Sequence, residues 1–215
     1  MIEEEIKFKT SRGLKLSGAL LAPDEELRDI VIFAHGTGSS KSSTRNRGIA
    51  EGLLAHGIAS FLFDFTGHGE SDGIMEQSTQ DQQFDDLISA LDFVSSQPYV
   101  QTRFIGINGS STGGTVAIRA AAEDERIQVM VLRVPRNYDI LQFVPLVNAP
   151  TLILQGSEDD IVLPEAKEIY ETLICPKKLH IVEGAGHLFY EKPHFLKEMT
   201  DASCEWFINW FKKLE

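Results

Sequence analysis

The sequence predicts an α/β fold built on a mostly parallel sheet, and three observations lead to this class. Short apolar runs of strand length recur along the 215 residues, and most of them are separated by helical patterns. Alternation of this kind favours βαβ units with helices on both faces of one sheet. Two β patterns at the start, at 6–10 and 14–23, are joined by turn residues and predict an antiparallel hairpin. We therefore expect one domain over residues 1–215, with eight strands.

The six strands after the hairpin are read from apolar runs without alternation, which are typical of strands buried on both faces. They lie at 30–35, 59–65, 104–110, 129–134, 151–156 and 178–184. The clearest helix starts near Thr79, which fits a capping box with Gln82, and ends before Pro98. A last helix from about Pro193 carries an apolar stripe wide enough to cover a sheet face. In such sheets, functional residues gather at the carboxyl ends of the strands.

Charge and composition narrow the classes of partner. A formal net charge of −12 would repel a phosphate backbone, so we expect no nucleic-acid partner. The acidic start lacks the layout of a secretory signal, and no window approaches the ~20 apolar residues of a membrane span. We expect a cytoplasmic protein with no membrane partner. Cys175 and Cys204 are isolated, which predicts reduced thiols and no metal site.

A candidate nucleophile stands where the apolar run at 104–110 meets a strong helix former. A serine presented on a sharp turn from strand to helix needs small residues two positions before and after it. Ser111 has Gly109 and Gly113 at these positions, whereas Ser110 is framed by asparagine and threonine. The frame therefore selects Ser111.

A serine nucleophile needs a histidine base, which a carboxylate holds in the correct tautomer. Three histidines follow Ser111, and of these His180 lies inside a strand pattern and His194 at the start of the last helix. His187 instead lies in a glycine-rich loop just after a strand, so it is the predicted base. For the acid, the strand at 151–156 opens into three consecutive carboxylates, of which at least one should face the same edge: Glu158, Asp159 and Asp160.

With these residues in view, nearly the whole chain resembles the α/β-hydrolase superfamily. The resemblance is carried by motifs at 34–40, 63–73, 109–114, 156–164 and 184–189. It implies that Asp159 is the acid, with Gly156 and Val162 at the ends of the family's G-x-x-D-x-x-V pattern, and that its two acidic neighbours are bystanders. More narrowly, the chain is similar to small bacterial enzymes of the dienelactone-hydrolase and cinnamoyl-esterase kinds.

The same resemblance implies an oxyanion hole formed by the backbone N–H groups of Thr37 and Thr112. His35 and His68 are expected to brace the surrounding loops rather than to act as bases. The predicted function is therefore a serine hydrolase of the carboxylesterase kind, with no cofactor, acting on a small acyl ester. Thioester, lactone and peptide bonds stay open as alternatives because they share the same tetrahedral intermediate. A homodimer is compatible with the sequence.

Two other classes of protein compete with this prediction. A phosphate-binding loop ending in Lys41 and Ser42 would need glycine at positions 40 and 35, where the chain has serine and histidine. A non-catalytic binding protein of the same fold is the second rival, but such proteins usually lose a member of the triad.

The substrate is constrained by the segment at 135–148, which is too short for a large helical lid and predicts an open site. Basic residues near the predicted edge are candidates for recognising an anionic substrate, with a solvated helix start as the alternative interpretation: Lys41, Arg45, Arg47, Arg133 and Arg136.

Overall fold

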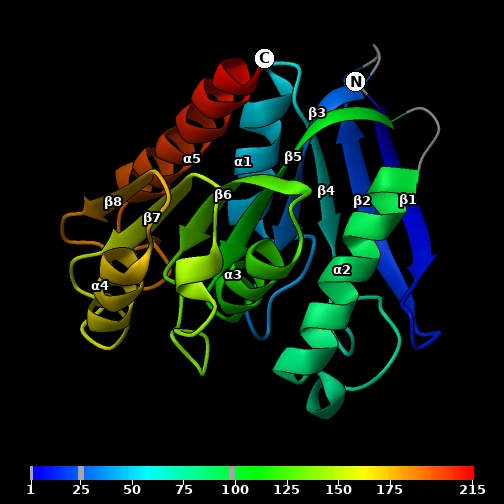
Figure 1. Cartoon of the computed structure of the whole chain (residues 1–215), viewed down its shortest axis with the longest axis horizontal. Helices are drawn as coiled ribbons and strands as arrows, with labels where there is room; N and C mark the ends of the chain where they lie inside the picture. Colours follow the sequence, from blue (N-terminus) through cyan, green and yellow to red (C-terminus); the bar gives the residue numbers. More distant parts are fainter. Residues whose placement is uncertain (1, 24–26, 97–99) are drawn as a thin grey trace.

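Eight strands form one sheet in the computed structural model of the chain, which describes residues 2–23, 27–96 and 100–215 (Figure 1). The strand order is β1-β2-β4-β3-β5-β6-β7-β8. The strands are β1 (Ile2–Lys9), β2 (Lys15–Ala22), β3 (Leu27–Ala34), β4 (Ala59–Phe63), β5 (Val100–Ser110), β6 (Ile127–Arg133), β7 (Thr151–Gly156) and β8 (Lys177–Val182). The predicted number of strands and their approximate positions are confirmed.

The sheet is antiparallel at its N-terminal edge and parallel elsewhere. β1 pairs with β2 and β2 with β4 in antiparallel fashion, and all other neighbours are parallel. β1 lies at the sheet edge, and in its second half only Ile6 and Phe8 are buried. β4 and β7 are buried along their whole length, as expected for strands covered on both faces. The predicted hairpin is confirmed as β1 and β2.

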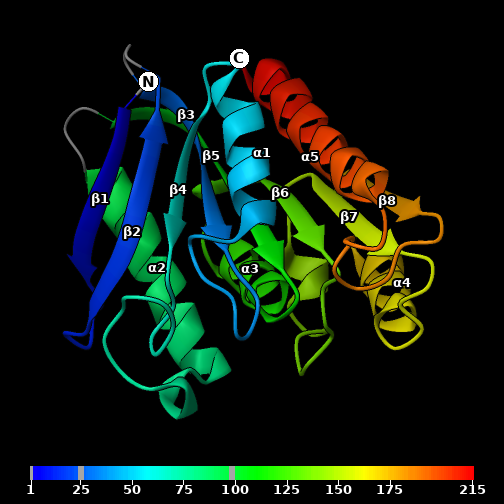
Figure 2. The same ribbon diagram turned by 180° about the vertical axis from the view of Figure 1, so that it is seen from behind.

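Helices cover both faces of this sheet. They are α1 (Thr44–Leu54), α2 (Gln80–Ser96), α3 (Thr112–Glu123), α4 (Val162–Thr172) and α5 (Pro193–Leu214), with short 3-10 turns η1 (Met75–Gln77) and η2 (Val144–Leu146). Figure 1 shows α2, α3 and α4 in front of the sheet, and Figure 2 shows α1 and α5 on the opposite face. Within the described residues, no helix has both the length and the apolar composition needed to cross a membrane.

Two helices show how local sequence signals act. The Gln82 N–H donates to the hydroxyl of Thr79 at 3.2 Å, so Thr79 caps α2 as predicted. The Gln82 side chain donates to Asp86 instead of completing a capping box. In α5 the apolar stripe buries Met199 and Phe207 against the sheet, which confirms that this helix is a cover for one face.

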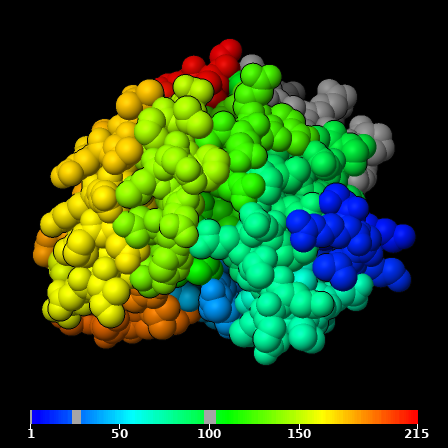
Figure 3. All heavy atoms as spheres, turned by 60° about the horizontal axis from the view of Figure 1, so that its bottom comes forward, coloured from blue at the N-terminus to red at the C-terminus, as the bar shows by residue number. Residues whose placement is uncertain are grey.

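The parallel strands end along one edge, the lower edge in Figure 1. Figure 3 turns this edge toward the reader and shows the segments that follow β3 (the lighter blue at the lower centre), β4 (turquoise) and β8 (orange) on the same face. Between β6 and β7 the chain makes only short turns and η2, with Ile140, Val144 and Val147 buried in the core. The prediction that no large helical insertion stands here is confirmed.

Candidate active site

Ser111 occupies the sharp turn between β5 and α3. Its backbone angles are φ 50° and ψ −120°, a conformation that strains a residue with a side chain. Hydrogen bonds hold the turn, because the Ser111 N–H donates to the carbonyl of Arg133 at 2.9 Å and its own carbonyl accepts from Gly114 N–H at 2.9 Å. The backbone strain therefore lies at the junction of strand and helix, at the serine that the flanking glycines predict.

The two framing glycines are required by close backbone contacts. A Cβ added to Gly109 would lie 2.7 Å from Cα of Gly114, and one added to Gly113 would lie 2.3 Å from the carbonyl oxygen of Ala34. Side chains at either position would push the helix away from the strands. Ser110, by contrast, is the last residue of β5 and is buried.

Asp159 and His187 form a short hydrogen bond. The Nδ1 atom of His187 lies 2.6 Å from Oδ2 of Asp159, and Gln155 donates to the same oxygen at 3.2 Å. A carboxylate accepting from Nδ1–H leaves Nε2 of the imidazole as the free base nitrogen. Asp159 is buried, whereas its neighbours Glu158 and Asp160 are exposed. Of the three candidate acids, only Asp159 is placed to orient the histidine.

The loops that carry the acid and the base are tied together by backbone contacts. A Cβ on Gly156 would lie 2.2 Å from the carbonyl oxygen of Ala185. The Glu158 N–H donates to that same carbonyl at 2.9 Å, and the Gly184 N–H donates to the Ser157 hydroxyl at 2.8 Å. The end of β7 therefore fixes the loop after β8 that presents His187.

The loop after β3 lies against Ser111. A Cβ on Gly36 would stand 3.1 Å from Cβ of Ser111. The Thr37 N–H donates to the Thr112 hydroxyl at 3.0 Å, and the two threonine hydroxyls are 3.1 Å apart. The two residues expected to supply oxyanion donors are therefore in direct contact, with one of the two N–H groups bonded to a side chain.

Comparison with known proteins places this geometry in a family. Residues 25–139 match a model of the serine aminopeptidase S33 family. A dienelactone hydrolase from Anabaena variabilis superposes with a TM-score of 0.88 at 33% identity, covering 97% of this chain and 98% of that one. The chain belongs to the α/β-hydrolase superfamily. This membership rests on the family model together with the solved neighbour.

Two further relatives define the range of this α/β-hydrolase similarity. Est1E from Butyrivibrio proteoclasticus, solved with ferulic acid bound, has a TM-score of 0.87 at 21% identity and covers 96% of this chain and 99% of that one. At this identity the likeness concerns the fold. A Mycobacterium tuberculosis protein named as a phosphoribosyl transferase is 35% identical over 209 residues, which are 96% of this chain and 46% of that protein. The chain thus spans about half the length of this curated relative.

His35 braces the loop after β3 of the α/β-hydrolase, as expected from the sequence. Its Nδ1–H donates to the Gly36 carbonyl at 2.8 Å and its Nε2 accepts from the Phe65 N–H at 3.1 Å. Both ring nitrogens are satisfied in the neutral form. His68 supports the same loop by accepting the Gly38 N–H at 3.2 Å. Burial lowers the pKa of His35 from 6.5 to about 4, although its bond to Gly36 opposes this shift.

We expect His35 to make the fold sensitive to mild acid. Between pH 6.5 and about pH 4 the unfolded chain binds a proton at this residue and the folded chain does not. Stability therefore falls as pH falls through this window, by on the order of 3 kcal/mol from this one group. Urea unfolding of the wild type and of His35→Gln at several pH values measures the effect. The variant should show a smaller fall across the window, and parallel curves would contradict the assignment.

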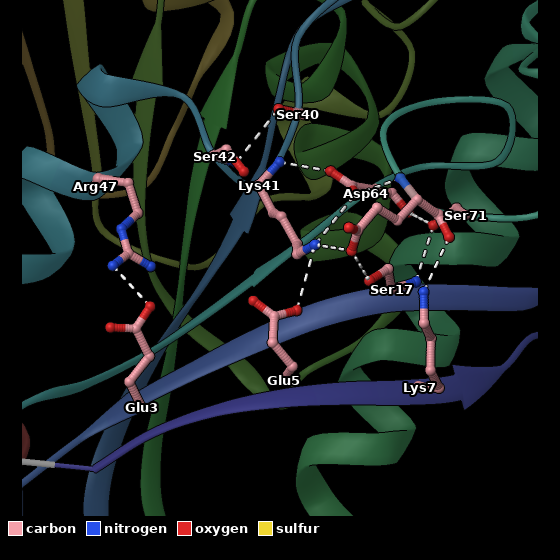
Figure 4. Close-up of polar contacts among 11 residues, drawn as sticks. Glu3, Glu5, Lys7, Ser17, Ser40, Lys41, Ser42, Arg47, Asp64 and Ser71 are labelled. Atoms are coloured by element: carbon pink, nitrogen blue, oxygen red, sulfur yellow. Dashed lines mark hydrogen bonds and ion pairs between the residues drawn. The ribbon is translucent and has the colours of Figure 1, made fainter.

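Lys41, expected as a candidate for substrate binding, is instead buried in an ion-pair cluster (Figure 4). Its Nζ lies 2.6 Å from Glu70, 3.3 Å from Glu5 and 3.7 Å from Asp64. The Lys41 N–H also donates to Asp64 at 2.6 Å. The cluster joins β1 to the loops after β3 and β4. Burial opposes the charge, but the hydrogen bond that Lys41 donates to Glu70 and the negative charge of Asp64 outweigh it and raise the pKa of Lys41.

Removing the Lys41 charge should weaken the fold rather than substrate binding. Lys41→Met leaves the buried Asp64 carboxylate without its cation, and we expect a loss of about 2 kcal/mol in the free energy of unfolding. Lys7→Met is the matched control, because Lys7 is exposed and donates to the Glu70 carbonyl beside the same cluster; its effect should stay below about 0.5 kcal/mol. A large rise in KM for Lys41→Met with unchanged stability would instead restore the substrate-binding interpretation.

The other two candidate substrate-binding residues are also engaged by the protein. Arg133 is only 2% exposed, so the expectation that it meets a substrate is wrong: its guanidinium points into the core between the sheet, α1 and α5. Arg136 forms a bidentate pair with Glu165 at 2.8 and 3.0 Å and stacks over Tyr138. The N–H groups with which Arg136 could bind an anionic substrate therefore donate to Glu165.

Arg45 contacts the loop that presents His187, a role the sequence did not reveal. Its guanidinium lies over the Tyr190 ring, 5.1 Å from the centroid, and donates to the Leu188 carbonyl at 3.5 Å. The adjacent Thr44 hydroxyl lies 2.9 Å from the Tyr190 hydroxyl. The first turn of α1 therefore supports the histidine loop from outside. The sequence showed only a basic cluster near the start of a helix.

Proposed function

We propose that the chain is a serine hydrolase that cleaves acyl esters through an acyl-enzyme on Ser111. The observation that carries the proposal is the 2.6 Å bond between Asp159 and His187, which leaves Nε2 of the imidazole free. Both residues stand on loops at the strand edge where the strained turn presents Ser111. A nucleophile, a base and a buried orienting acid are the groups that acyl transfer requires.

The proposed reaction has two stages. His187 Nε2 takes the proton of the Ser111 hydroxyl as its oxygen attacks the carbonyl carbon, and then passes that proton to the leaving alcohol. The same nitrogen removes a proton from water, which attacks the acyl-enzyme and releases the acid. Asp159 stabilises the imidazolium that forms in each stage and itself stays ionised.

The oxyanion is proposed to bind the N–H groups of Thr37 and Thr112. One such donor contributes on the order of 3 kcal/mol to transition-state stabilisation. Because the Thr37 N–H donates to the Thr112 hydroxyl in this structure, the substrate oxygen has to displace that hydroxyl. The displacement exchanges one neutral hydrogen bond for a charge-assisted one, which favours the anion over the ground-state carbonyl.

The substrate is proposed to be a small or protruding acyl ester. Only short turns and η2 stand between β6 and β7, so no helical insertion there covers the strand edge. Lactone hydrolysis is the second candidate, and it is favoured by the 33% identity with a dienelactone hydrolase over 97% of this chain. Competing esters, thioesters and lactones at equal concentration would rank these classes by kcat/KM.

Labelling with a fluorophosphonate tests the proposal directly. The reagent phosphonylates a serine only where a base and an oxyanion hole activate it, so we expect one adduct on the peptide that holds Ser111. Mass spectrometry locates the adduct, and prior denaturation should abolish it. A folded protein that stays unlabelled and hydrolyses no activated ester would refute the proposed function.

A further inference from the structure

Arg133 is a buried cation whose contacts are all neutral. Its Nε donates to Asn108 Oδ1 at 2.9 Å and its Nη2 donates to Asn46 Oδ1. Its Nη1 lies 4.0 Å from the Met199 sulfur. The residue is 2% exposed, so the guanidinium is shielded from bulk solvent.

No carboxylate pairs with Arg133 in the part of the chain that the structure describes. Burial, together with the nearby positive charge of Arg45, lowers the pKa of Arg133 to about 9, while Tyr190 opposes this shift. The guanidinium is thus still charged at neutral pH. Other arginines of this acidic protein are paired with carboxylates: Arg47, Arg119, Arg126 and Arg136.

An uncompensated buried charge is unfavourable for folding, and one conservative change would remove it. Burial without a counter-charge destabilises the folded state, because neutral acceptors restore only part of the lost hydration. An aspartate at position 46 would keep the acceptor oxygen that already faces Nη2 and add the absent negative charge. A buried charge without a counter-charge is an exception in an otherwise well-packed core, and such exceptions are expected where function requires them.

The position of Arg133 suggests that function. Arg133 is the last residue of β6, and its Cα pairs with Ser110 on β5. Its carbonyl accepts the Ser111 N–H at 2.9 Å, and its Asn108 partner lies three residues before Ser111. The cation therefore lies behind the strained turn, on the side of the sheet covered by α1 and α5. Protein rather than solvent fills the space around it, so its field is poorly screened.

We propose that Arg133 is a fixed positive charge that stabilises the negative charge developing next to Ser111 during acyl transfer. Asn46 and Asn108 hold the guanidinium through neutral oxygens and so keep its charge uncompensated. The inference rests on the proposed function. Arg133 touches no substrate, so it acts through its field on the transition state and is not a catalytic residue.

Asn46→Asp separates this role from a purely structural one. The variant keeps the hydrogen bond to Arg133 and neutralises its charge. We expect the free energy of unfolding to rise, while kcat for an activated ester falls about tenfold, equivalent to about 1.4 kcal/mol. KM should stay within about twofold, because the ground-state ester is uncharged. The fall in kcat should persist at 1 M salt, since both charges are buried.

Asn209→Asp is the matched control, because it adds the same charge at an exposed position of α5 on the same face. It should change neither kcat nor stability appreciably. If Asn46→Asp does not fold, Asn108→Asp places the charge on the other acceptor and must give the same two results. Higher stability with unchanged kcat would overturn the proposal, as would lower stability of both aspartate variants, since Arg133 would then not be an uncompensated cation. Absence of both turnover and fluorophosphonate labelling in the wild type would instead refute the proposed function itself.

Discussion

Ser111→Ala is expected to lower kcat for an activated ester by about 10⁴-fold or more, because no acyl-enzyme can form without the hydroxyl. Alanine has the same backbone preferences as serine at φ 50°, so the fold and its stability should be retained. Hydrolysis of p-nitrophenyl acetate measures activity, and circular dichroism and thermal unfolding verify that the variant is folded.

Ser110→Ala is the control for this experiment. Ser110 belongs to β5 and is 8% exposed, and its side chain makes no contact on which the proposed reaction depends. We expect it to retain most of the wild-type kcat, with fluorophosphonate labelling unchanged. Equal activity of the two alanine variants would rule out Ser111 as the nucleophile.

Asp159→Asn is expected to have the second largest effect, a fall in kcat of about 10³ to 10⁴-fold. Asparagine is nearly the same size as aspartate but carries no charge to stabilise the imidazolium. Its amide group can also donate to Nδ1 of His187, which would place the histidine proton on Nε2 and prevent that nitrogen from accepting the serine proton. Steady-state kinetics at pH 7.5 would measure the loss, with KM changing little.

The neighbouring acids supply matched controls for Asp159. Glu158→Gln and Asp160→Asn each remove one charge from an exposed side chain in the same loop. Both variants should keep kcat within about twofold of the wild type. A loss in Asp160→Asn as large as that in Asp159→Asn would show that the loop rearranges and that the acid has been assigned to the wrong residue.

The strands and the strained turn could be predicted because their signals are local. Apolar runs without alternation predict strands covered on both faces, and six of the eight strands were recognised in this way. Gly109 and Gly113 stand where a Cβ would clash with neighbouring backbone atoms, so five consecutive residues around Ser111 are enough to predict the turn. Asp159 was separated from its two acidic neighbours only by resemblance to a family, since three adjacent carboxylates give no local signal of which one is buried.

The roles of the basic residues could not be predicted because they depend on partners far away in the sequence. Lys41 pairs with Glu5 on β1 and with Glu70 in the loop after β4, and these residues come near it only in the folded sheet. Arg133 ends a strand at the functional edge, but its side chain points to the face covered by α1 and α5, where it meets Asn46 and Asn108. A basic residue at the end of a strand predicts a position at the edge of the sheet. It does not predict on which face of the sheet the side chain lies.

The backbone of Ser111 has a consequence for how this protein can evolve. Glycine adopts positive φ without penalty, so Ser111→Gly would relax the turn and produce a more stable but inert protein. Serine and glycine codons can differ by a single base. In a duplicated copy that still has to fold but no longer needs the proposed activity, the single-base change and the gain in stability both favour glycine. Inactive descendants of this protein should therefore carry glycine at position 111 more often than any other residue.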